Sequence, residues 1–118
     1  MTDISIIDMS KSDILTKEIA RDFRKGLLKF FILKMLDREE MHGYAMMSRI
    51  EEVSGWRPSS GSLHPALMKL QAAGLIKFRT SGLKKIFSIT KKGKEVIKQL
   101  DDNFDDGLNG IKMIFENL

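Results

Sequence analysis

The sequence contains no cysteine in its 118 residues. Disulfide bonds, thiol catalysis and thiol-based redox sensing are therefore excluded, and the composition fits a reducing intracellular compartment. No segment approaches the ~18 consecutive apolar residues that a membrane-spanning helix needs. The N-terminus also lacks a basic region that leads into an apolar stretch. We therefore expect a single-domain, cytoplasmic protein with no membrane partner.

Groups of catalytic or metal-binding residues are also missing. The two histidines, His42 and His64, do not have the spacing of a metal site, and there are no cysteine ligands. The serines around Ser60 lack the sequence context of a catalytic nucleophile. Asp101 and Asp105 are one helical turn apart and are more simply a solvated acidic face. We expect no enzymatic activity, no metal and no cofactor.

Basic residues are unevenly distributed, although the net charge of the whole chain is only +4. Residues 57–98 hold ten basic residues and one acidic residue, a local charge of +9, whereas the rest of the chain sums to −5. Such polarity indicates a surface that faces a polyanion such as nucleic acid. Charge alone leaves open the alternative of a solvated lysine-rich face.

Apolar residues recur every four positions up to Leu36, which predicts one long amphipathic helix that begins at Ser12 or Thr16. Its apolar stripe consists of Leu15, Ile19, Phe23, Leu27, Phe31 and Met35. A second helix is expected after Gly43, with Gly55 as its C-terminal cap. The apolar face of this second helix consists of Met47, Ile50 and Val53.

A third helix follows a serine-rich turn and stops at Gly74, and its N-terminal cap is expected to be Ser60 or Ser62. Its inward face consists of Leu63, Leu67 and Leu70. We expect its single glutamine, Gln71, to point toward the core side. Few side chains of this helix could then make bidentate contacts with bases, so direct readout of sequence should be limited.

Beyond the third helix the pattern changes from helical to extended. Residues 75–80 and 83–90 are typical of two strands of a β-hairpin, joined by a turn at Ser81-Gly82. Three helices followed by a hairpin is the order of a winged helix-turn-helix domain. The expected fold class is therefore mostly α with a small β-hairpin wing (α+β), and residues 27–90 are expected to form the winged domain.

Thr90 is expected to cap a fourth helix over residues 91–118. Gly107 and Gly110 weaken this helix by roughly 1 kcal/mol each, so its end should need packing against another surface. This helix and a helical extension over residues 1–26 carry apolar stripes that one small domain cannot cover, which predicts a homodimer. The expected dimer contacts are Leu15, Ile19, Phe23, Phe104, Leu108, Ile111 and Phe115.

Three motifs follow one another in the chain: His42-Gly43-Tyr44, Trp56-x-Pro58-Ser59-x-Gly61-Ser62-Leu63-His64-Pro65-Ala66-Leu67, and Leu70-x-x-x-Gly74-Leu75-Ile76. They resemble the signature of the PadR family, and residues 84–93 resemble its second wing strand and the entry into the next helix. The resemblance implies a homodimer that binds operator DNA, often as a repressor, with a small-molecule effector in some members. The sequence departs from the pattern at His64, where tyrosine is more usual, and at Ser60, where a second proline is common.

Candidate DNA contacts lie mainly on the third helix and the hairpin. They are Tyr44, Ser60, Ser62, His64, Lys69, Arg79, Lys84 and Lys85. Ser62 and the backbone N–H groups at the helix start can bind a phosphate, with capping alone as the alternative. Tyr44 either offers its hydroxyl to the DNA backbone or packs its ring in the core. The three hairpin cations are expected close together, either on phosphates or protecting an exposed strand edge.

Trp56 is expected to fill a structural slot between helices or near the dimer interface, with a platform for a planar ligand as the alternative. The function expected from all these features is sequence-specific binding of double-stranded DNA by a homodimeric transcriptional regulator. The alternative is a winged-helix module for protein association, in which the basic face binds an acidic protein partner.

Overall fold

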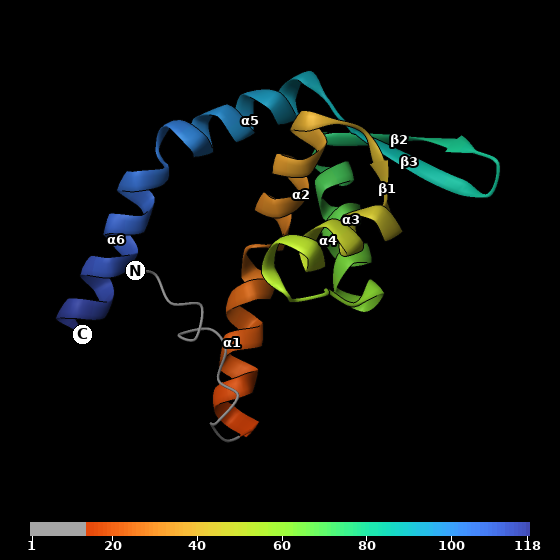
Figure 1. The fold of residues 1–118 in the computed structure, drawn as a ribbon. Coiled ribbons are helices and arrows are strands. Elements are labelled where there is room, and N and C mark those ends of the chain that lie inside the picture. The colour runs from red at the N-terminus through yellow and green to blue at the C-terminus, as the bar shows by residue number, and fades with distance from the viewer. Residues whose placement is uncertain (1–13) are drawn as a thin grey trace.

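The computed structural model describes residues 14–118, without the side chains of residues 14–16 and 20 (Figure 1). The elements of this part are α1 (Ile14–Gly26), α2 (Leu28–Arg38), β1 (Met41–His42), α3 (Gly43–Ser54), α4 (Ser60–Ala72), β2 (Ile76–Ser81), β3 (Lys84–Ile89), α5 (Lys91–Asp102) and α6 (Phe104–Asn117). The three strands form one antiparallel sheet in the order β1-β3-β2. The expected mostly helical fold with a β-hairpin wing is confirmed.

The short strand β1 adds a third strand to the expected hairpin. Met41 pairs with Phe87 and His42 pairs with Ile86, both in β3. Two residues are too few to show the period-2 alternation of a strand, so the sequence pattern did not indicate β1. Because α3 begins directly after β1, this pairing holds the N-terminus of α3 beside the hairpin.

The core lies between α2, α3, α4, α5 and the sheet, with α2 at its centre. Helix α2 buries Leu28, Ile32, Leu33 and Leu36. On α3 the buried residues are Met46 and Ile50, whereas Val53, predicted on the apolar face, is exposed because it lies in the last turn beyond the core. A single core thus supports α3, α4 and the hairpin, and their exposed faces keep a fixed arrangement.

The long first helix predicted from the apolar stripe is interrupted. Gly26 ends α1. The N–H of Leu27 donates to the carbonyl of Arg24, three residues back, at 3.1 Å, which makes a tighter turn than an α-helix. The α-helical hydrogen bond to the carbonyl four residues back resumes at Phe31. Glycine is a poor helix former, which explains why the break falls here. The C-terminal helix is also interrupted, at Asn103, whose side-chain amide donates to the carbonyl of Gln99 at 2.8 Å.

The boundaries of the middle elements follow the expected capping residues closely. Gly55 and Gly74 end α3 and α4 with φ angles of 77° and 76°, a left-handed conformation that glycine adopts without strain, as predicted. Thr90 caps α5 as predicted, because its Oγ1 accepts a hydrogen bond from the N–H of Gly93 at 3.1 Å. The hairpin turn lies at Gly82-Leu83, one residue later than expected.

The entry into α5 packs against the end of α4 with little free space. The hydroxyl of Thr90 also donates to the carbonyl of Gly74 at 2.6 Å, and the N–H of Thr90 donates to the carbonyl of Leu75 at 3.0 Å. A Cβ atom at position 93 would overlap the oxygen of Leu75 and lie 2.6 Å from Cγ1 of Ile89. Only glycine fits at this position, which joins α5 to the hairpin.

The molecule is elongated, with principal extents of 46 × 30 × 24 Å. Figure 1 shows the hairpin of β2 and β3 projecting at one end, while α6 lies at the opposite end and α1 extends away from the core. Among the helices described, none combines the length and apolar character needed to cross a membrane.

Candidate nucleic-acid interface

A groove of about 230 Å³ lies between α3, α4 and β3. Its apolar floor consists of Met47, Leu63, Leu67 and Phe87, and its rim consists of the half-buried Gly43 and the exposed residues Tyr44, Ser60, His64, Met68, Gln71 and Lys85. Four of the predicted DNA contacts, Tyr44, Ser60, His64 and Lys85, therefore meet at one concave surface from three separate elements. The other four, Ser62, Lys69, Arg79 and Lys84, do not line it.

The exposed face of α4 carries His64, Met68 and Gln71, which are four and three residues apart and border the groove. The prediction that Gln71 points toward the core is wrong. Helix α4 buries Leu63, Ala66, Leu67 and Leu70. Gln71 follows Leu70 and lies about 100° farther around the helix, which brings it to the surface. The 64-68-71 spacing is visible in the sequence and could have indicated this stripe.

The first turn of α4 is capped by Ser59, not by Ser60 or Ser62. The Oγ of Ser59 accepts a hydrogen bond from the N–H of Ser62 at 3.2 Å and donates to the Oγ of Ser62 at 3.1 Å. The hydroxyl of Ser62 is thus part of the cap, while Ser60 is exposed at the groove. A helix N-terminus presents unpaired N–H donors and a positive dipole end, so this end of α4 suits an anionic phosphate.

The three cations predicted on the wing lie on two faces of the hairpin. Lys85 is on the face toward α4, and its ammonium group lies 4.7 Å from the ring centroid of Phe78. Lys84 and Arg79 lie on the opposite face, because alternate residues of a strand point to opposite sides. The guanidinium of Arg79 also forms an ion pair with Glu40 at 2.6 Å. Of these three cations, Lys85 is the one that borders the groove.

The ring of Tyr44 is not part of the core, because the residue is 65% exposed. The His42 ring is nearly parallel to it, with centroids 6.5 Å apart. The guanidinium of Arg57 lies 4.9 Å from its centroid. Tyr44 also lines the groove, and its exposure excludes the core-packing alternative.

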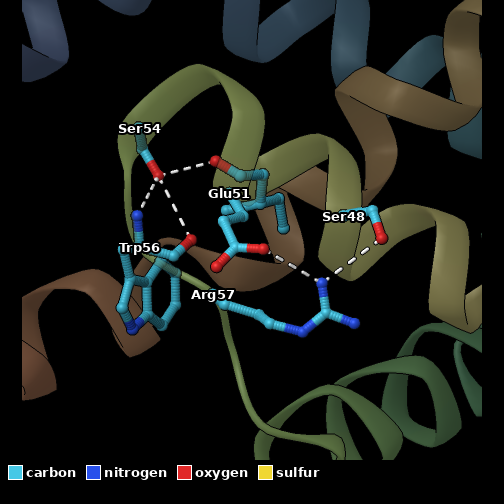
Figure 2. Close-up of polar contacts among 6 residues, drawn as sticks. Ser48, Glu51, Ser54, Trp56 and Arg57 are labelled. Atoms are coloured by element: carbon cyan, nitrogen blue, oxygen red, sulfur yellow. Dashed lines mark hydrogen bonds and ion pairs between the residues drawn. The ribbon is translucent and has the colours of Figure 1, made fainter.

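The turn between α3 and α4 is held by two groups of polar contacts (Figure 2). The Oγ of Ser54 accepts a hydrogen bond from the N–H of Trp56 at 3.1 Å. The Nη1 of Arg57 donates to the Oγ of Ser48 at 3.3 Å and to the Oε1 of Glu51 at 3.2 Å. These contacts tie the turn to the last two turns of α3.

Trp56 lies in the structural position expected from the sequence. Its side chain is half-buried and packs against the core cluster. The guanidinium of Arg24, from α1, lies 5.6 Å from the centroid of the tryptophan ring. Trp56 therefore connects α1 to the turn that precedes α4.

Helices α1 and α6 expose the apolar side chains predicted to form a dimer. Ile19, Phe23, Phe104, Leu108, Ile111 and Phe115 are between 45% and 73% exposed. Leu15 belongs to α1, but its side chain lies outside the described part of the structure. Phe104 stacks on Phe30 of α2 with ring centroids 6.0 Å apart, which supports the start of α6. The other apolar side chains of α6 are largely uncovered in a single chain.

Asp101 has a structural contact rather than a purely solvated position. Its carboxylate forms an ion pair with Lys34 at 3.0 Å and thereby joins α5 to α2. Across residues 14–118 the histidine and acidic side chains form no group of three that could hold a metal ion.

Comparison with known proteins identifies the family. The profile described as "Transcriptional regulator PadR-like family" matches residues 32–99. The chain is 34% identical over 82 residues to the transcriptional regulator YqjI of Escherichia coli strain K12, which covers 67% of this chain and 40% of the relative. It is 36% identical over 76 residues to the negative transcriptional regulator PadR of Bacillus subtilis strain 168, which covers 58% of this chain and 42% of the relative. The chain thus spans about two fifths of the length of these relatives.

Solved structures share the fold. The crystal structure of Bacillus subtilis PadR in complex with operator DNA is 32% identical, with a TM-score of 0.56, and the match covers 62% of this chain and 44% of that chain. A PadR-family transcriptional regulator from Eggerthella lenta, 23% identical, has a TM-score of 0.72 and matches 93% of this chain and 99% of its own. Because the family profile covers more than half of the sequence, the chain belongs to the PadR-like family of transcriptional regulators.

Proposed function

We propose that this protein binds operator DNA as a homodimer and represses transcription. The observation that carries the proposal is the groove at which Tyr44, Ser60, His64 and Lys85 meet. The similarity of the chain to Bacillus subtilis PadR, whose structure was solved in complex with operator DNA, supports duplex DNA as the ligand. The family consists of transcriptional regulators, and we propose no enzymatic activity.

Helix α4 is the element suited to the major groove, which is wide enough to admit one α-helix. In that position its stripe of His64, Met68 and Gln71 would face base edges. The N-terminus of α4 and the ammonium group of Lys85 would lie near phosphates on either side. Phosphate contacts fix the register of a protein on the duplex, whereas contacts with base edges supply sequence preference.

The homodimer is supported by the exposed apolar side chains of α1 and α6. In a two-fold dimer each such surface would meet its own copy and become buried. We assign the dimer contact to residues 1–26 and 91–118 and DNA binding to residues 27–90. The two copies of α4 would then lie about one duplex turn, roughly 34 Å, or a multiple of it apart.

Repression is supported by the similarity to a protein named as a negative transcriptional regulator. A repressor must reach the DNA that it regulates, and we propose that this protein does so in the cytoplasm. A small-molecule effector is implied by the family resemblance alone, and we assign no residues to it.

Selection of duplexes from a random-sequence library by the purified chain, followed by gel shifts at moderate salt, tests the proposal. We expect enrichment of a sequence with two symmetric halves. Binding should weaken steeply as salt rises, because lysine contacts with phosphates release condensed counterions. Absence of both enrichment and a shifted band would contradict the proposal and would favour a module that binds an acidic protein partner.

A further inference from the structure

Arg57 stands at the start of the basic segment of residues 57–98, yet its charge is used within the chain. Its guanidinium donates to the carboxylate of Glu51 and to the hydroxyl of Ser48 (Figure 2). Its side chain is 32% exposed, so more than half of it is covered. Both hydrogen bonds come from Nη1, and the ion pair with Glu51 offsets part of the positive charge that a phosphate would meet.

The same guanidinium also stacks on Tyr44. Its Cζ atom lies 4.9 Å from the ring centroid, within the ≈ 6 Å at which a cation is attracted to the face of an aromatic ring. Tyr44, Ser48 and Glu51 are four and three residues apart and share one face of α3. Arg57 therefore lies along this face and contacts a residue in each of its successive turns.

Tyr44 has few other contacts that could fix the direction of its ring. The residue is mostly exposed, and the other ring beside it is that of His42. We propose that Arg57 is a positioning residue for DNA binding. Stacked on Tyr44 and anchored by Glu51 and Ser48, it holds the ring so that the hydroxyl faces a phosphate of the bound duplex. This inference rests on the proposed function.

For the removal of Glu51, the proposal predicts a change in DNA affinity opposite in direction to the usual one. Removing an acidic residue from a DNA-binding protein normally strengthens binding to the polyanion. Glu51 acts through Arg57, so its loss should instead release the guanidinium and weaken binding. Glu52 is the matched control, because it is adjacent on α3 and carries the same charge but pairs with Arg49, away from Tyr44.

Binding of a fluorescein-labelled duplex, selected from a random library with the wild-type chain, tests this difference over a range of salt concentrations. We expect Glu51→Ala and Arg57→Ala to weaken binding about two- to fivefold, the effect of one exposed cation–π contact. Glu52→Ala should leave binding unchanged or slightly tighter. Tighter binding by Glu51→Ala would overturn the proposal.

The salt dependence and a double-variant comparison separate positioning from direct phosphate contact. Arg57→Ala should leave the slope of log K against log salt unchanged, whereas loss of a phosphate contact lowers it by about 0.9. The penalty of Arg57→Ala should also vanish in a Tyr44→Ala background, where no ring remains to be held. Arg57→Lys should restore binding only in part, because lysine keeps the positive charge but lacks the planar group that stacks on the ring. A lowered slope, or an equal penalty in both backgrounds, would overturn the proposal.

A measurement without DNA distinguishes failure of this inference from failure of the proposed function. Tyr44 is the single tyrosine of the chain, so its ring signals in a ¹H–¹³C spectrum are unambiguous. They should shift in Arg57→Ala and Glu51→Ala and stay in place in Glu52→Ala. Unchanged ring signals in Arg57→Ala overturn the inference whatever the DNA result. A wild-type chain that binds no duplex contradicts the proposed function. In that case the ring signals alone decide whether Arg57 holds the ring of Tyr44.

Discussion

Two neighbouring lysines of the wing have the same charge and different surroundings. Lys85 borders the groove with its ammonium group near the ring of Phe78, whereas Lys84 lies on the opposite face of the hairpin. Both side chains are exposed, so both could hold counterions in the free protein. The face of the strand, rather than the charge, decides which one can reach a duplex seated against α4.

Replacing Lys85 by alanine should reduce the slope of log K against log salt by about 0.9, the value for one lost phosphate contact. Replacing Lys84 should change the slope less, and Lys84→Ala serves as the matched control. Fluorescence anisotropy titrations of the selected duplex at several salt concentrations measure both slopes. Equal reductions of the slope in the two variants would contradict the prediction that Lys85, on the groove-facing side of the hairpin, contacts a phosphate and Lys84 does not.

Gln71 is expected to contribute to the sequence preference. Its side chain borders the groove and is exposed. Glutamine pairs with the N6 and N7 of adenine through two hydrogen bonds, which gives about 1–3 kcal/mol of discrimination. Library selection with Gln71→Ala should therefore lose the preference for adenine at one position in each half-site. A selected sequence identical to that of the wild type would argue against base contact.

At the scale of elements, the middle of the chain could be predicted from sequence because local signals agree with the packing. Gly55 and Gly74 mark the ends of α3 and α4, and Thr90 marks the start of α5. The breaks at Leu27 and Asn103 could not be predicted from the apolar stripe, because the stripe continues on both sides of each break. A kink changes the direction of a helix without changing its sequence period.

The candidate site was predictable in part for similar reasons. Tyr44 was found because its type and spacing resemble a family pattern, and Ser60 and His64 were found because they lie within the matching motif, although their types depart from that pattern. Their meeting with Lys85 depends on how β3 packs beside α4, which no local pattern records. The stacking of Arg57 on Tyr44 likewise joins residues whose contact arises only after the turn closes.

The junction between the hairpin and α5 should be sensitive to a single methyl group. Gly93→Ala places a Cβ against the carbonyl oxygen of Leu75, and overpacking of this kind costs about 1–3 kcal/mol of unfolding free energy. Gly110→Ala in α6 is the control, because the added Cβ meets no atom within 4 Å apart from its chain neighbours and the backbone of its own helix. There the higher helix propensity of alanine should stabilise by up to roughly 1 kcal/mol. Urea unfolding at one protein concentration measures both changes, and a Gly93→Ala variant as stable as wild type would contradict the close approach.

At the scale of the whole molecule, the groove proposed to bind DNA and the exposed apolar helix α6 lie in different parts of the structure. Figure 1 shows the hairpin at one end and α6 at the other. Side chains on the α6 stripe can therefore be changed without touching the groove. This separation makes dimerisation and DNA contact independently testable, although both should determine affinity for a two-fold operator.

Charged residues in the apolar stripe should separate the two copies. Leu108 and Ile111 are each close to half exposed, so replacing both by aspartate removes little packing within one chain. It would place four carboxylates in a two-fold contact, where like charges without partners are strongly unfavourable. We expect a folded monomer in sedimentation.

The same double variant should bind the selected duplex about 10²-fold more weakly or worse, because the second half-site no longer adds to the first. Asn109→Asp is the matched control, since it adds a carboxylate to the same helix about 100° beyond Leu108 and off the stripe. It should remain dimeric and bind with nearly wild-type affinity. A double variant that stays dimeric would remove α6 from the interface, and a monomer that binds as tightly as wild type would show that one copy of α4 is sufficient for recognition.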